Sequence, residues 1–526
     1  MTYLAVPIAA PDLETARQQI KAALAAGAQM LELRTDYLEN LSVDLAKNLI
    51  GEVRAAISRP IPIIVTCRDK QQGGALAYPQ KLRIDVLTTA LKAGVEFVDV
   101  EFENFLCTEN QERIRVALSQ GAKGRLILSA HNFKTKFENI KKLYRSIFTS
   151  YPGAIPKLIY TANHINDCFE AFDLLHQTSG ERIIFCMGEA GLISRILAKK
   201  LGSFLTFASI DEQSATAPGQ LTIEQFQNLY RYGDINSDTE LFGVIADPVG
   251  HSLSPAIHNA CFAEAEMNKL YLPLLVQGDQ EKFDEFLNNA LSRKWLHFRG
   301  FSVTIPHKEN ALNYVKARNG FIEPLAEKIG AANTVVIDAR RTTHDAGRLF
   351  AYNTDYAAAL DAITAALGIG RADLKGMPVA VIGAGGVARA IVAGLIDVGA
   401  KIKIYNRTVE RGQKLASEFG CEFAGLDDLA NLEAKLLINC TSIGMHPDVD
   451  ATPVPKEYLR KGMALFDTVY NPAQTKLLKQ AKRKRLKTID GLSMFINQAA
   501  AQFKLFTGQN ANPEVMRKTI CQKLIC

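Results

Sequence analysis

Short apolar runs alternate with amphipathic segments through the first 230 residues of the chain. Eight of these runs have the length and composition of buried strands, at residues 3–8, 30–33, 61–67, 97–102, 126–130, 158–160, 183–187 and 204–208. Segments between them, such as 13–24 and 79–91, repeat apolar residues at helical spacing. Eight strand–helix alternations over this length favour a (β/α)8 TIM barrel, with an open doubly wound sheet of eight strands as the alternative.

A different pattern follows residues 232–240, a polar stretch typical of a linker. New strands are predicted at 242–245 and 301–305, and again at Val381-Ile382, where closely spaced glycines lead into a helical pattern. Such a strand–turn–helix can hold the pyrophosphate of a dinucleotide at the helix N-terminus, while an ordinary tight turn is the alternative. The predicted phosphate loop consists of Gly383, Ala384, Gly385, Gly386, Val387 and Ala388.

The next strand, at 400–405, bears on the choice of cofactor. An NAD enzyme places an acidic residue after this strand to bind the ribose 2′-hydroxyl, but this chain has Asn406-Arg407-Thr408. One cation and two hydrogen-bonding side chains suit a 2′-phosphate. The sequence therefore predicts NADP.

Polar side chains gather just past the predicted strand ends of the first 230 residues. Because the carboxyl ends of barrel strands meet at one face, these side chains are expected to lie together. Each alone is better explained as a structural ion pair or a loop residue, but three arginines in one place suit a carboxylate substrate. The set comprises Glu32, Arg34, Asp36, Arg68, Glu101, His131, Arg195, Thr216 and Gln220.

Lys157 stands at the start of the sixth predicted strand. A lysine inside a barrel is costly unless it is paired or neutral, and burial beside arginines favours the neutral, nucleophilic amine. His131 is placed to move protons for a Schiff base on that amine. The alternatives are a Lys157 at the bottom of the strand pointing to solvent and a His131 that is merely hydrogen-bonded.

Composition restricts the classes of protein to which the chain can belong. The 526 residues exceed one core, and the net charge of +6 suits anionic small molecules better than nucleic acid. There is no apolar run of about 18 residues, which predicts no membrane span. Nine cysteines without a CxxC pair, and an N-terminus that begins with a strand, predict a cytoplasmic protein without a signal peptide.

No metal-ligand spacing is present. The basic run 482–485 is interpreted as a solvated helix face.

Six motifs in the first 230 residues resemble type I 3-dehydroquinate dehydratase: LELRTD at 31–36, TCR at 66–68, SAHNF at 129–133, PK at 156–157, GLISR at 191–195 and APGQ at 217–220. The resemblance implies that Lys157 forms an imine with the C3 ketone and that His131 removes the C2 proton and returns it to the departing C1 hydroxyl. The implied substrate-binding residues are Glu32, Arg34, Arg68, Arg195, Thr216 and Gln220. Two positions depart from the family pattern: Gln72 replaces a common acid, and Thr216 a common serine.

The remainder, over about residues 241–526, resembles shikimate dehydrogenase. The motifs are ADPVGHSLSPAIHN at 246–259, FSVTIPHK at 301–308, AANT at 331–334, YNTD at 352–355, NCTSIGM at 439–445, DTVYNP at 467–472 and DGLSMFINQA at 490–499. By this resemblance Lys308 and Asp355 form the catalytic pair. The implied substrate-binding residues are Ser252, Ser254, Thr304, Asn333, Tyr470 and Gln498, and the implied nicotinamide neighbours are Thr468, Gly491 and Met494. Taken alone, Lys308 is a solvated charge, and Ser254 and Asp355 are helix caps.

The whole chain therefore resembles a bifunctional enzyme that dehydrates 3-dehydroquinate and reduces the product with NADPH to shikimate. Expected boundaries are 1–230 for the barrel, 231–240 for a linker, 241–372 with 492–526 for the substrate-binding domain, and 373–491 for a Rossmann domain that binds NADP. A quinate dehydrogenase and a non-catalytic quinate or shikimate sensor are the alternatives. The sequence leaves the oligomeric state open and predicts neither nucleic-acid nor membrane partners.

Overall fold

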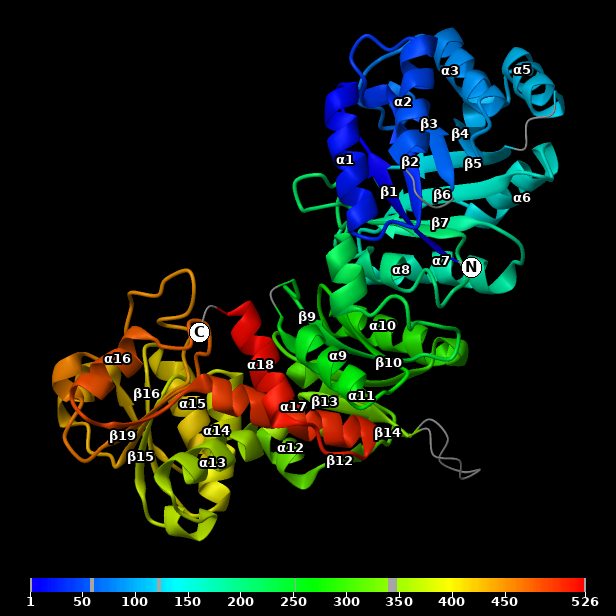
Figure 1. Ribbon diagram of the computed structural model, residues 1–526. Helices are drawn as coiled ribbons and strands as arrows, with labels where there is room; N and C mark the ends of the chain where they lie inside the picture. Colours follow the sequence, from blue (N-terminus) through cyan, green and yellow to red (C-terminus); the bar gives the residue numbers. More distant parts are fainter. Residues whose placement is uncertain (1, 57–60, 121–123, 251, 339–347, 525–526) are drawn as a thin grey trace. The chain divides into compact units, whose positions relative to one another are not determined.

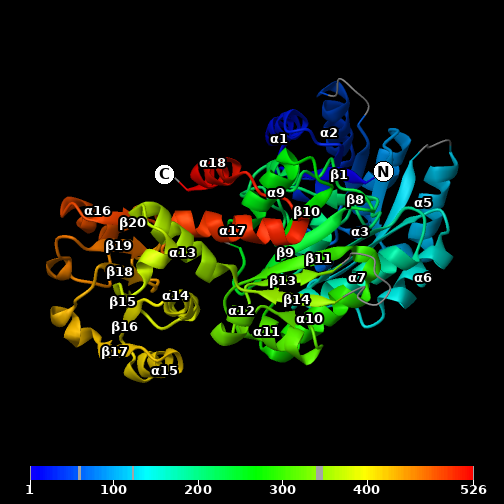
Figure 2. The ribbon, with the colours of Figure 1, turned by 90° about the horizontal axis from the view of Figure 1, so that it is seen from below.

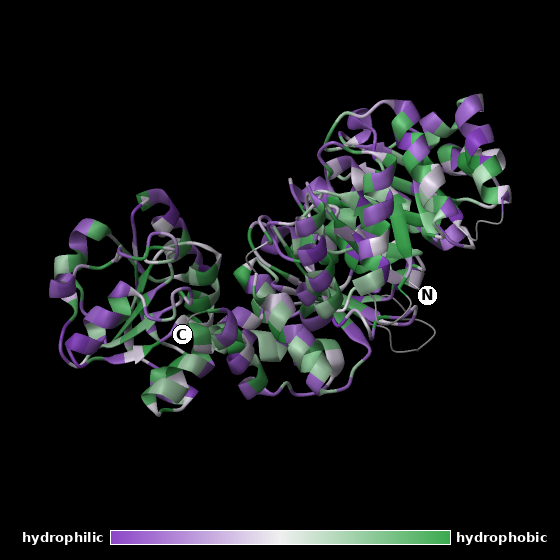
Figure 3. Ribbon diagram, turned by 45° about the horizontal axis from the view of Figure 1, so that its top comes forward, coloured by the Kyte–Doolittle hydropathy of each residue, from purple (hydrophilic) through white to green (hydrophobic). Residues whose placement is uncertain are grey.

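The computed structural model describes residues 2–56, 61–120, 124–250, 252–338 and 348–524. The chain forms two compact units that divide between Thr239 and Glu240, except that Leu274–Val276 group with the first unit. Hydrophobic residues concentrate in the strands of each sheet, while the surrounding helices carry both hydrophobic and hydrophilic residues (Figure 3). Each unit is described separately.

The first unit is an eight-stranded parallel barrel, which confirms the predicted fold (Figure 1). Its strands are β1 (Tyr3–Ile8), β2 (Met30–Arg34), β3 (Ile63–Thr66), β4 (Phe97–Glu101), β5 (Arg125–Asn132), β6 (Ile155–Thr161), β7 (Ile183–Met187) and β8 (Leu205–Phe207). Seven neighbouring pairs form parallel ladders in the order β7-β6-β5-β4-β3-β2-β1-β8. The backbone N–H of Phe204 donates to Arg182 O at 2.7 Å, which brings the β8 side to the β7 side and nearly closes the barrel.

Helices follow most of these strands, as the alternating pattern predicts. They are α1 (Leu13–Ala25), α2 (Val43–Ala56), α3 (Gln80–Lys92), α4 (Phe102–Phe105), α5 (Thr108–Ser119), α6 (Ile140–Ser150), α7 (Cys168–Gln177) and α8 (Leu192–Ile196). The buried faces of α1, α2 and α3 repeat every three or four residues, so each helix packs an apolar stripe towards the strands.

The barrel interior changes from apolar to polar along the strands. The amino-terminal layer is apolar and includes Met30, Ile64, Phe97, Ile127, Ile155, Ile183 and Leu205. Because side chains alternate along a strand, the interior positions two residues further on form the next layer. That layer is polar on β2 to β6 and aromatic on β7 and β8, and contains Glu32, Thr66, Asp99, Ser129, Lys157, Phe185 and Phe207. An apolar layer of side chains thus lies beneath a layer that is mostly polar.

The second unit begins with a mixed six-stranded sheet in the order β10-β9-β11-β13-β14-β12. Its strands are β9 (Glu240–Ala246), β10 (Lys269–Leu275), β11 (Phe298–Val303), β12 (Phe321–Ile322), β13 (Thr334–Ile337) and β14 (Leu349–Tyr352), and its helices are α9 (Ser254–Glu264), α10 (Gln280–Ser292), α11 (Lys308–Ala317) and α12 (Pro324–Ile329). β9 and β11 are parallel, so the loops that follow them leave the same edge of the sheet.

A second sheet of the same unit is entirely parallel, in the doubly wound order β17-β16-β15-β18-β19-β20 (Figure 2). The strands are β15 (Pro378–Ile382), β16 (Lys401–Asn406), β17 (Glu422–Gly425), β18 (Leu436–Asn439), β19 (Ala464–Asp467) and β20 (Lys487–Ile489). The helices of this half are α13 (Thr354–Leu367), α14 (Gly386–Asp397), α15 (Val409–Phe419), α16 (Lys476–Arg483), α17 (Gly491–Thr507) and α18 (Pro513–Lys523). The predicted Rossmann fold is confirmed.

Helix α17 joins the two halves of this unit. It packs along α13 and also contacts α9, β11 and β13 of the mixed sheet, while α18 packs on α9. The chain therefore returns to the mixed sheet after the parallel sheet is complete. Among the described residues, none of the helices is both long and apolar enough to span a bilayer.

Two candidate active sites

A cavity of about 550 Å³ opens at the carboxyl ends of the barrel strands. It brings together all eight residues that sequence analysis assigned to the dehydratase, from six separate places along the chain. The lining includes Glu32, Arg34, Arg68, His131, Lys157, Arg195, Thr216 and Gln220. Around them lie Gln72, Gly73 and Phe133 and the apolar side chains Ile159, Phe185, Met187 and Phe207.

Lys157 lies inside β6 and is only 4% exposed, so it does not point to solvent at the bottom of the strand. Its Nζ donates to Asp99 Oδ2 at 2.7 Å and lies 3.6 Å from Glu32 Oε1. The Phe207 ring centroid is 4.9 Å away. The sequence led us to expect arginines as the dominant neighbours, but the charged groups nearest to the amine are these two carboxylates.

His131 extends from β5 into the same cavity. Burial, together with the charges of Arg68 and Lys157, lowers the pKa of His131 well below its ordinary value. Its Nδ1 has no hydrogen-bond partner among the described residues, and its ring stacks on Phe133 with centroids 5.7 Å apart. A neutral imidazole with an unused nitrogen can accept a proton.

Of the residues that line this cavity, Arg195 indicates an anionic ligand most strongly. Its side chain is 1% exposed, and no acid or hydrogen-bond acceptor contacts its guanidinium among the described residues. Burial lowers the pKa of Arg195 to about 10, and the guanidinium lies over the Phe185 ring at 4.7 Å. A buried cation without a partner is expensive, so this position suits a carboxylate supplied by the substrate.

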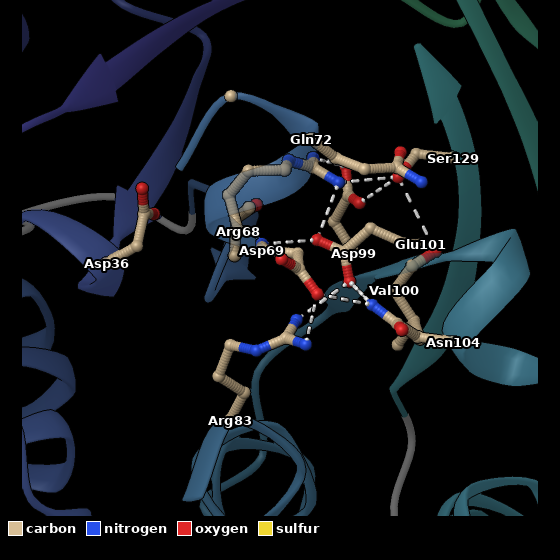
Figure 4. A network of polar contacts seen from close by, with 12 residues as sticks. Asp36, Arg68, Asp69, Gln72, Arg83, Asp99, Val100, Glu101, Asn104 and Ser129 are labelled. Atoms are coloured by element: carbon tan, nitrogen blue, oxygen red, sulfur yellow. Dashed lines mark hydrogen bonds and ion pairs between the residues drawn. The ribbon is translucent and has the colours of Figure 1, made fainter. Parts of the chain in front are cut away.

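The other two arginines are held by acids of the protein. Arg34 forms a bidentate pair with Asp36 at 2.9 and 2.8 Å. Arg68 donates to Ser129 Oγ at 2.7 Å and forms ion pairs with Asp99 at 2.9 Å and Glu101 at 3.2 Å (Figure 4). These guanidiniums are therefore fixed before any ligand binds.

Sequence analysis missed the network below the cavity. Asp99 and Ser129 were not singled out, and Glu101 was given no role. Glu101 also binds Arg83 and Asn104, which joins the cavity floor to α3 and α4 (Figure 4). The sequence could have predicted the two acids, because alternate residues of a strand share one face and Phe97, Asp99 and Glu101 alternate along a buried strand.

The two departures from the family pattern both lie at this cavity. Gln72 Nε2 donates to Glu103 Oε2 at 2.9 Å, and its Oε1 has no partner among the described residues. The Thr216 hydroxyl donates to Gln220 Oε1 at 3.2 Å, so the threonine keeps a hydroxyl at this position.

A second cavity, of about 750 Å³, lies in the second unit between the mixed sheet and the parallel sheet. It gathers every residue assigned to the reductase substrate and four of those assigned to the cofactor. The first group is Ser252, Ser254, Thr304, Lys308, Asn333, Asp355, Tyr470 and Gln498, and the second is Val387, Thr468, Gly491 and Met494.

Lys308 and Asp355 form an ion pair with Nζ to Oδ2 at 2.5 Å. Asn333 Nδ2 donates to Asp355 Oδ1 at 2.9 Å, so the carboxylate is held from two sides. Asp355 is not the cap of α13, because Asn353 accepts the Asp355 N–H at 3.1 Å and fills that role. Ser254 likewise makes no side-chain cap bond at α9, whose N-cap is Leu253.

Two further polar residues of this cavity were missed. Ser302 Oγ donates to Gln502 Oε1 at 2.7 Å, and Gln502 Nε2 donates to the backbone oxygen of Asn333 at 3.3 Å. Gln502 lies one helical turn beyond Gln498 on α17, and this spacing could have predicted that both side chains lie on the same face of the helix. Tyr470 stacks on Phe495 with centroids 4.6 Å apart, which fixes the tyrosine at the cavity wall.

The glycine loop has the shape that a dinucleotide requires. Gly383 has φ +109°, which only glycine adopts readily, and a Cβ there would approach Cys440 O to 3.1 Å. A Cβ on Gly385 or Gly386 would meet no atom within 4 Å, so the backbone is open to a ligand. Among the described residues, no side chain caps the N-terminus of α14 at Gly385, and the N–H groups of its first turn suit a pyrophosphate.

The residues proposed for the 2′-phosphate lie beside this loop rather than in the cavity. β15 and β16 are adjacent, with Ile382 opposite Tyr405, and the Gly383 N–H donates to Tyr405 O at 2.8 Å. Asn406, Arg407 and Thr408 follow at the same edge, and Asn406 Nδ2 donates to Thr408 O at 2.7 Å. No acidic partner of Arg407 occurs among the described residues, so its charge is available.

Family models match the chain in four consecutive segments. The type I 3-dehydroquinase model matches residues 4–237, and the shikimate dehydrogenase substrate binding domain matches 244–335. The shikimate/quinate 5-dehydrogenase model matches 365–492, and the shikimate 5′-dehydrogenase C-terminal domain matches 491–521.

Similar proteins cover one or both halves. The bifunctional 3-dehydroquinate dehydratase/shikimate dehydrogenase of Arabidopsis thaliana, a chloroplastic protein, is 34% identical over 98% of this chain and 83% of its own length. The NADP⁺ shikimate dehydrogenase of Methanosarcina acetivorans is 40% identical over 54% of this chain and 98% of its own. A crystal structure of Thermus thermophilus shikimate 5-dehydrogenase with NADP(H) and shikimate is 35% identical, covers 54% of this chain and 100% of that one, and has a TM-score of 0.47. From the match along almost its whole length, the chain belongs to the family of bifunctional 3-dehydroquinate dehydratase/shikimate dehydrogenases.

Proposed function

We propose that Lys157 and His131 catalyse the first reaction of this bifunctional enzyme and that Lys308 and Asp355 catalyse the second. The enzyme dehydrates 3-dehydroquinate to 3-dehydroshikimate and reduces 3-dehydroshikimate to shikimate with NADPH. The observation that carries the first assignment is a buried lysine in a cavity that also holds Arg195, a buried cation without a partner. A ring acid that also carries a ketone needs both groups, one for its carbonyl and one for its carboxylate.

In the first reaction, Lys157 attacks the C3 ketone and forms an imine with loss of water. The cationic nitrogen withdraws electrons, so that the C2 proton can be removed. His131 takes this proton, because its lowered pKa keeps the ring neutral at ordinary pH. The same ring then returns the proton to the C1 hydroxyl as it departs. Arg195 supplies a partner for the substrate carboxylate, and Arg34, Arg68, Glu32, Thr216 and Gln220 surround the remaining ring.

In the second reaction, NADPH would supply a hydride to the ketone when it is bound. The Lys308 ammonium, held by Asp355 at 2.5 Å, donates a hydrogen bond to the carbonyl oxygen and then the proton. Asn333 orients Asp355, and Ser252, Ser254, Thr304, Tyr470 and Gln498 bind the carboxylate and hydroxyls of the ring. The open backbone at Gly385 and Gly386 suits the pyrophosphate, and Arg407 suits the 2′-phosphate.

The proposal assigns one function to each part of the chain. Residues 1–230 act as the dehydratase, and 231–240 link it to the reductase. In the reductase, 241–372 with 492–526 bind the substrate and 373–491 bind NADP. The division between Thr239 and Glu240 supports the position of the linker. The described cysteines are all free thiols, which supports a cytoplasmic location.

The Lys157 assignment is tested by trapping the imine. Borohydride added with 3-dehydroquinate should attach ligand mass to the peptide that carries Lys157. Lys157→Ala should lose both the adduct and dehydration, while NADPH-dependent reduction continues in the other unit. Lys92→Ala, which removes an exposed lysine at the end of α3, should keep the adduct. An adduct on another lysine, or none in the unaltered chain, would disprove the assignment.

A further inference from the structure

Asp99 is the nearest acid to the Lys157 amine, and the proposed function gives it no role. Its carboxylate is completely buried and receives three donors from three strands or strand ends. Oδ1 accepts from Ser129 Oγ at 2.6 Å, and Oδ2 accepts from Lys157 Nζ at 2.7 Å and Arg68 Nη2 at 2.9 Å. Glu32, the other acid near Lys157, is 3.6 Å away and accepts from Thr66 Oγ1 at 2.8 Å.

The surroundings of Asp99 keep it charged. Burial alone would raise the pKa of Asp99, but the charges of Arg68 and Lys157 outweigh that effect and hold the pKa below its usual range. Ser129 adds a hydrogen bond that favours the anion. A permanent negative charge therefore lies against the lysine nitrogen, below the cavity.

The nitrogen also lies over an aromatic ring. The Phe207 ring centroid is 4.9 Å from Nζ, and Phe185, Ile159 and Met187 line the same cavity. An aromatic face attracts a cation only weakly, and a cationic imine sheds its proton more readily than a lysine ammonium does. The neutral imine withdraws electrons poorly, so the C2 proton would stay in place. The site therefore needs an anion beside the nitrogen.

The charge on the nitrogen can be followed through the reaction. An ammonium and a ketone give a protonated imine and water, so the nitrogen begins and ends this step with one positive charge. Removal of the C2 proton moves an electron pair to the nitrogen and makes it neutral. Expulsion of the C1 hydroxyl, with the proton held by His131, takes the pair back and restores the charge. Water then releases the ketone and the ammonium.

We propose that Asp99 is the counter-ion of the Lys157 nitrogen at each of its charged stages and that it keeps the imine protonated. Arg68 makes the neutral stage tolerable, because it remains on the same carboxylate oxygen when the nitrogen loses its charge. The inference rests on the proposed role of Lys157. It adds a residue that acts on the nitrogen charge itself rather than on the substrate carboxylate.

The test is Asp99→Asn, which keeps the shape and removes the charge. Loss of one charge-assisted contact, about 1.5–3 kcal/mol, should lower the dehydratase kcat at pH 7.5 by about 10- to 100-fold. Without the anion the imine needs more acid to stay protonated, so the alkaline limb of the kcat profile should move to lower pH. Borohydride trapping at pH 6 should still place the adduct on Lys157. KM should change less, because Arg195 does not touch Asp99.

Controls separate charge from folding. Asp85→Asn breaks an ion pair with Arg113 on the outside of the barrel and should leave kcat and its pH profile unchanged. Reductase activity and circular dichroism show whether each variant is folded. If Asp99→Asn does not fold, Asp99→Ser, which also removes the charge, should give the same shift.

Each outcome decides the inference. A kcat that falls equally at all pH values, with no movement of the alkaline limb, would mean that Asp99 only positions the side chain and would overturn the proposal. An unchanged kcat would overturn it as well. Absence of the adduct in the unaltered chain would instead remove the proposed role of Lys157, and the two failures are therefore distinguishable.

Discussion

Replacement of Lys308 by methionine removes one ammonium from the reductase site and keeps most of the side-chain volume. The lysine Nζ lies 2.5 Å from Asp355 Oδ2, and both side chains line the second cavity. If Lys308 donates the proton to the ketone, its loss should lower kcat by about 10²–10⁴-fold, the usual range for an acid–base group. This range corresponds to about 3–5 kcal/mol of transition-state stabilisation.

The fold should survive this change. Asp355 keeps the Asn333 Nδ2 donor at 2.9 Å, so its carboxylate is not left without a partner. Substrate affinity should fall little, because Ser252, Ser254 and the other hydroxyl-bearing residues of the cavity remain. The effect is therefore expected on kcat and kcat/KM together.

The assay is NADPH oxidation with 3-dehydroshikimate, with dehydratase activity measured on the same sample as a check on the preparation. Lys316→Met, which changes an exposed lysine of the same helix that pairs with Glu327, should leave kcat unchanged. A Lys308→Met chain that retains kcat and shows only a raised KM would refute the reasoning. Lys308 would then bind substrate, and the proton donor would have to be sought elsewhere.

Three further predictions concern charged or titratable side chains outside the Lys308–Asp355 pair. Arg407→Ala should remove a contact worth about 1.5–3 kcal/mol, so NADP binding should weaken by about 10- to 100-fold while NAD binding stays nearly unchanged. Equal losses for both cofactors would mean that Arg407 supports the fold instead. Because the pKa of His131 is lowered, the dehydratase kcat/KM should stay constant as pH falls through 6.5, and a decline centred there would contradict a neutral buried base. His258 is buried against Tyr271 and its pKa is lowered to about 3, so below pH 6.5 the unfolded chain gains a proton that the native chain does not. Through this group, the free energy of unfolding should be about 2 kcal/mol lower at pH 5 than at pH 8. Urea unfolding of His258→Phe should not show this difference. An identical pH dependence of the free energy of unfolding in both proteins would refute the prediction.

The alternation of apolar runs and amphipathic segments favoured the barrel over an open sheet, and the glycine turn after Val381-Ile382 indicated the Rossmann fold. Both signals are local, because a buried parallel strand and a glycine turn each show within a few residues. The residues that converge at the two cavities could also be named, since they lie at strand ends or match family motifs. Their roles remain predictions until the variants are measured.

The partners inside each site could not be predicted from local pattern. Lys157 pairs with Asp99, 58 positions earlier, because both face the interior of the barrel at the same level, and this level depends on strand register. Sequence analysis expected arginines around the lysine and missed the acid. It also could not show that Arg195 is left without a partner while Arg34 and Arg68 are paired, because absence of a contact is a property of the packed structure.

The most direct measurement uses the purified chain with 3-dehydroquinate as the only carbon substrate. Without NADPH, 3-dehydroshikimate should accumulate, and no reduced product should form. With NADPH, one molecule should be oxidised for each 3-dehydroquinate consumed, and shikimate should be the product. Formation of quinate, or dehydration without any NADPH oxidation, would contradict the account of one chain that performs both reactions in sequence.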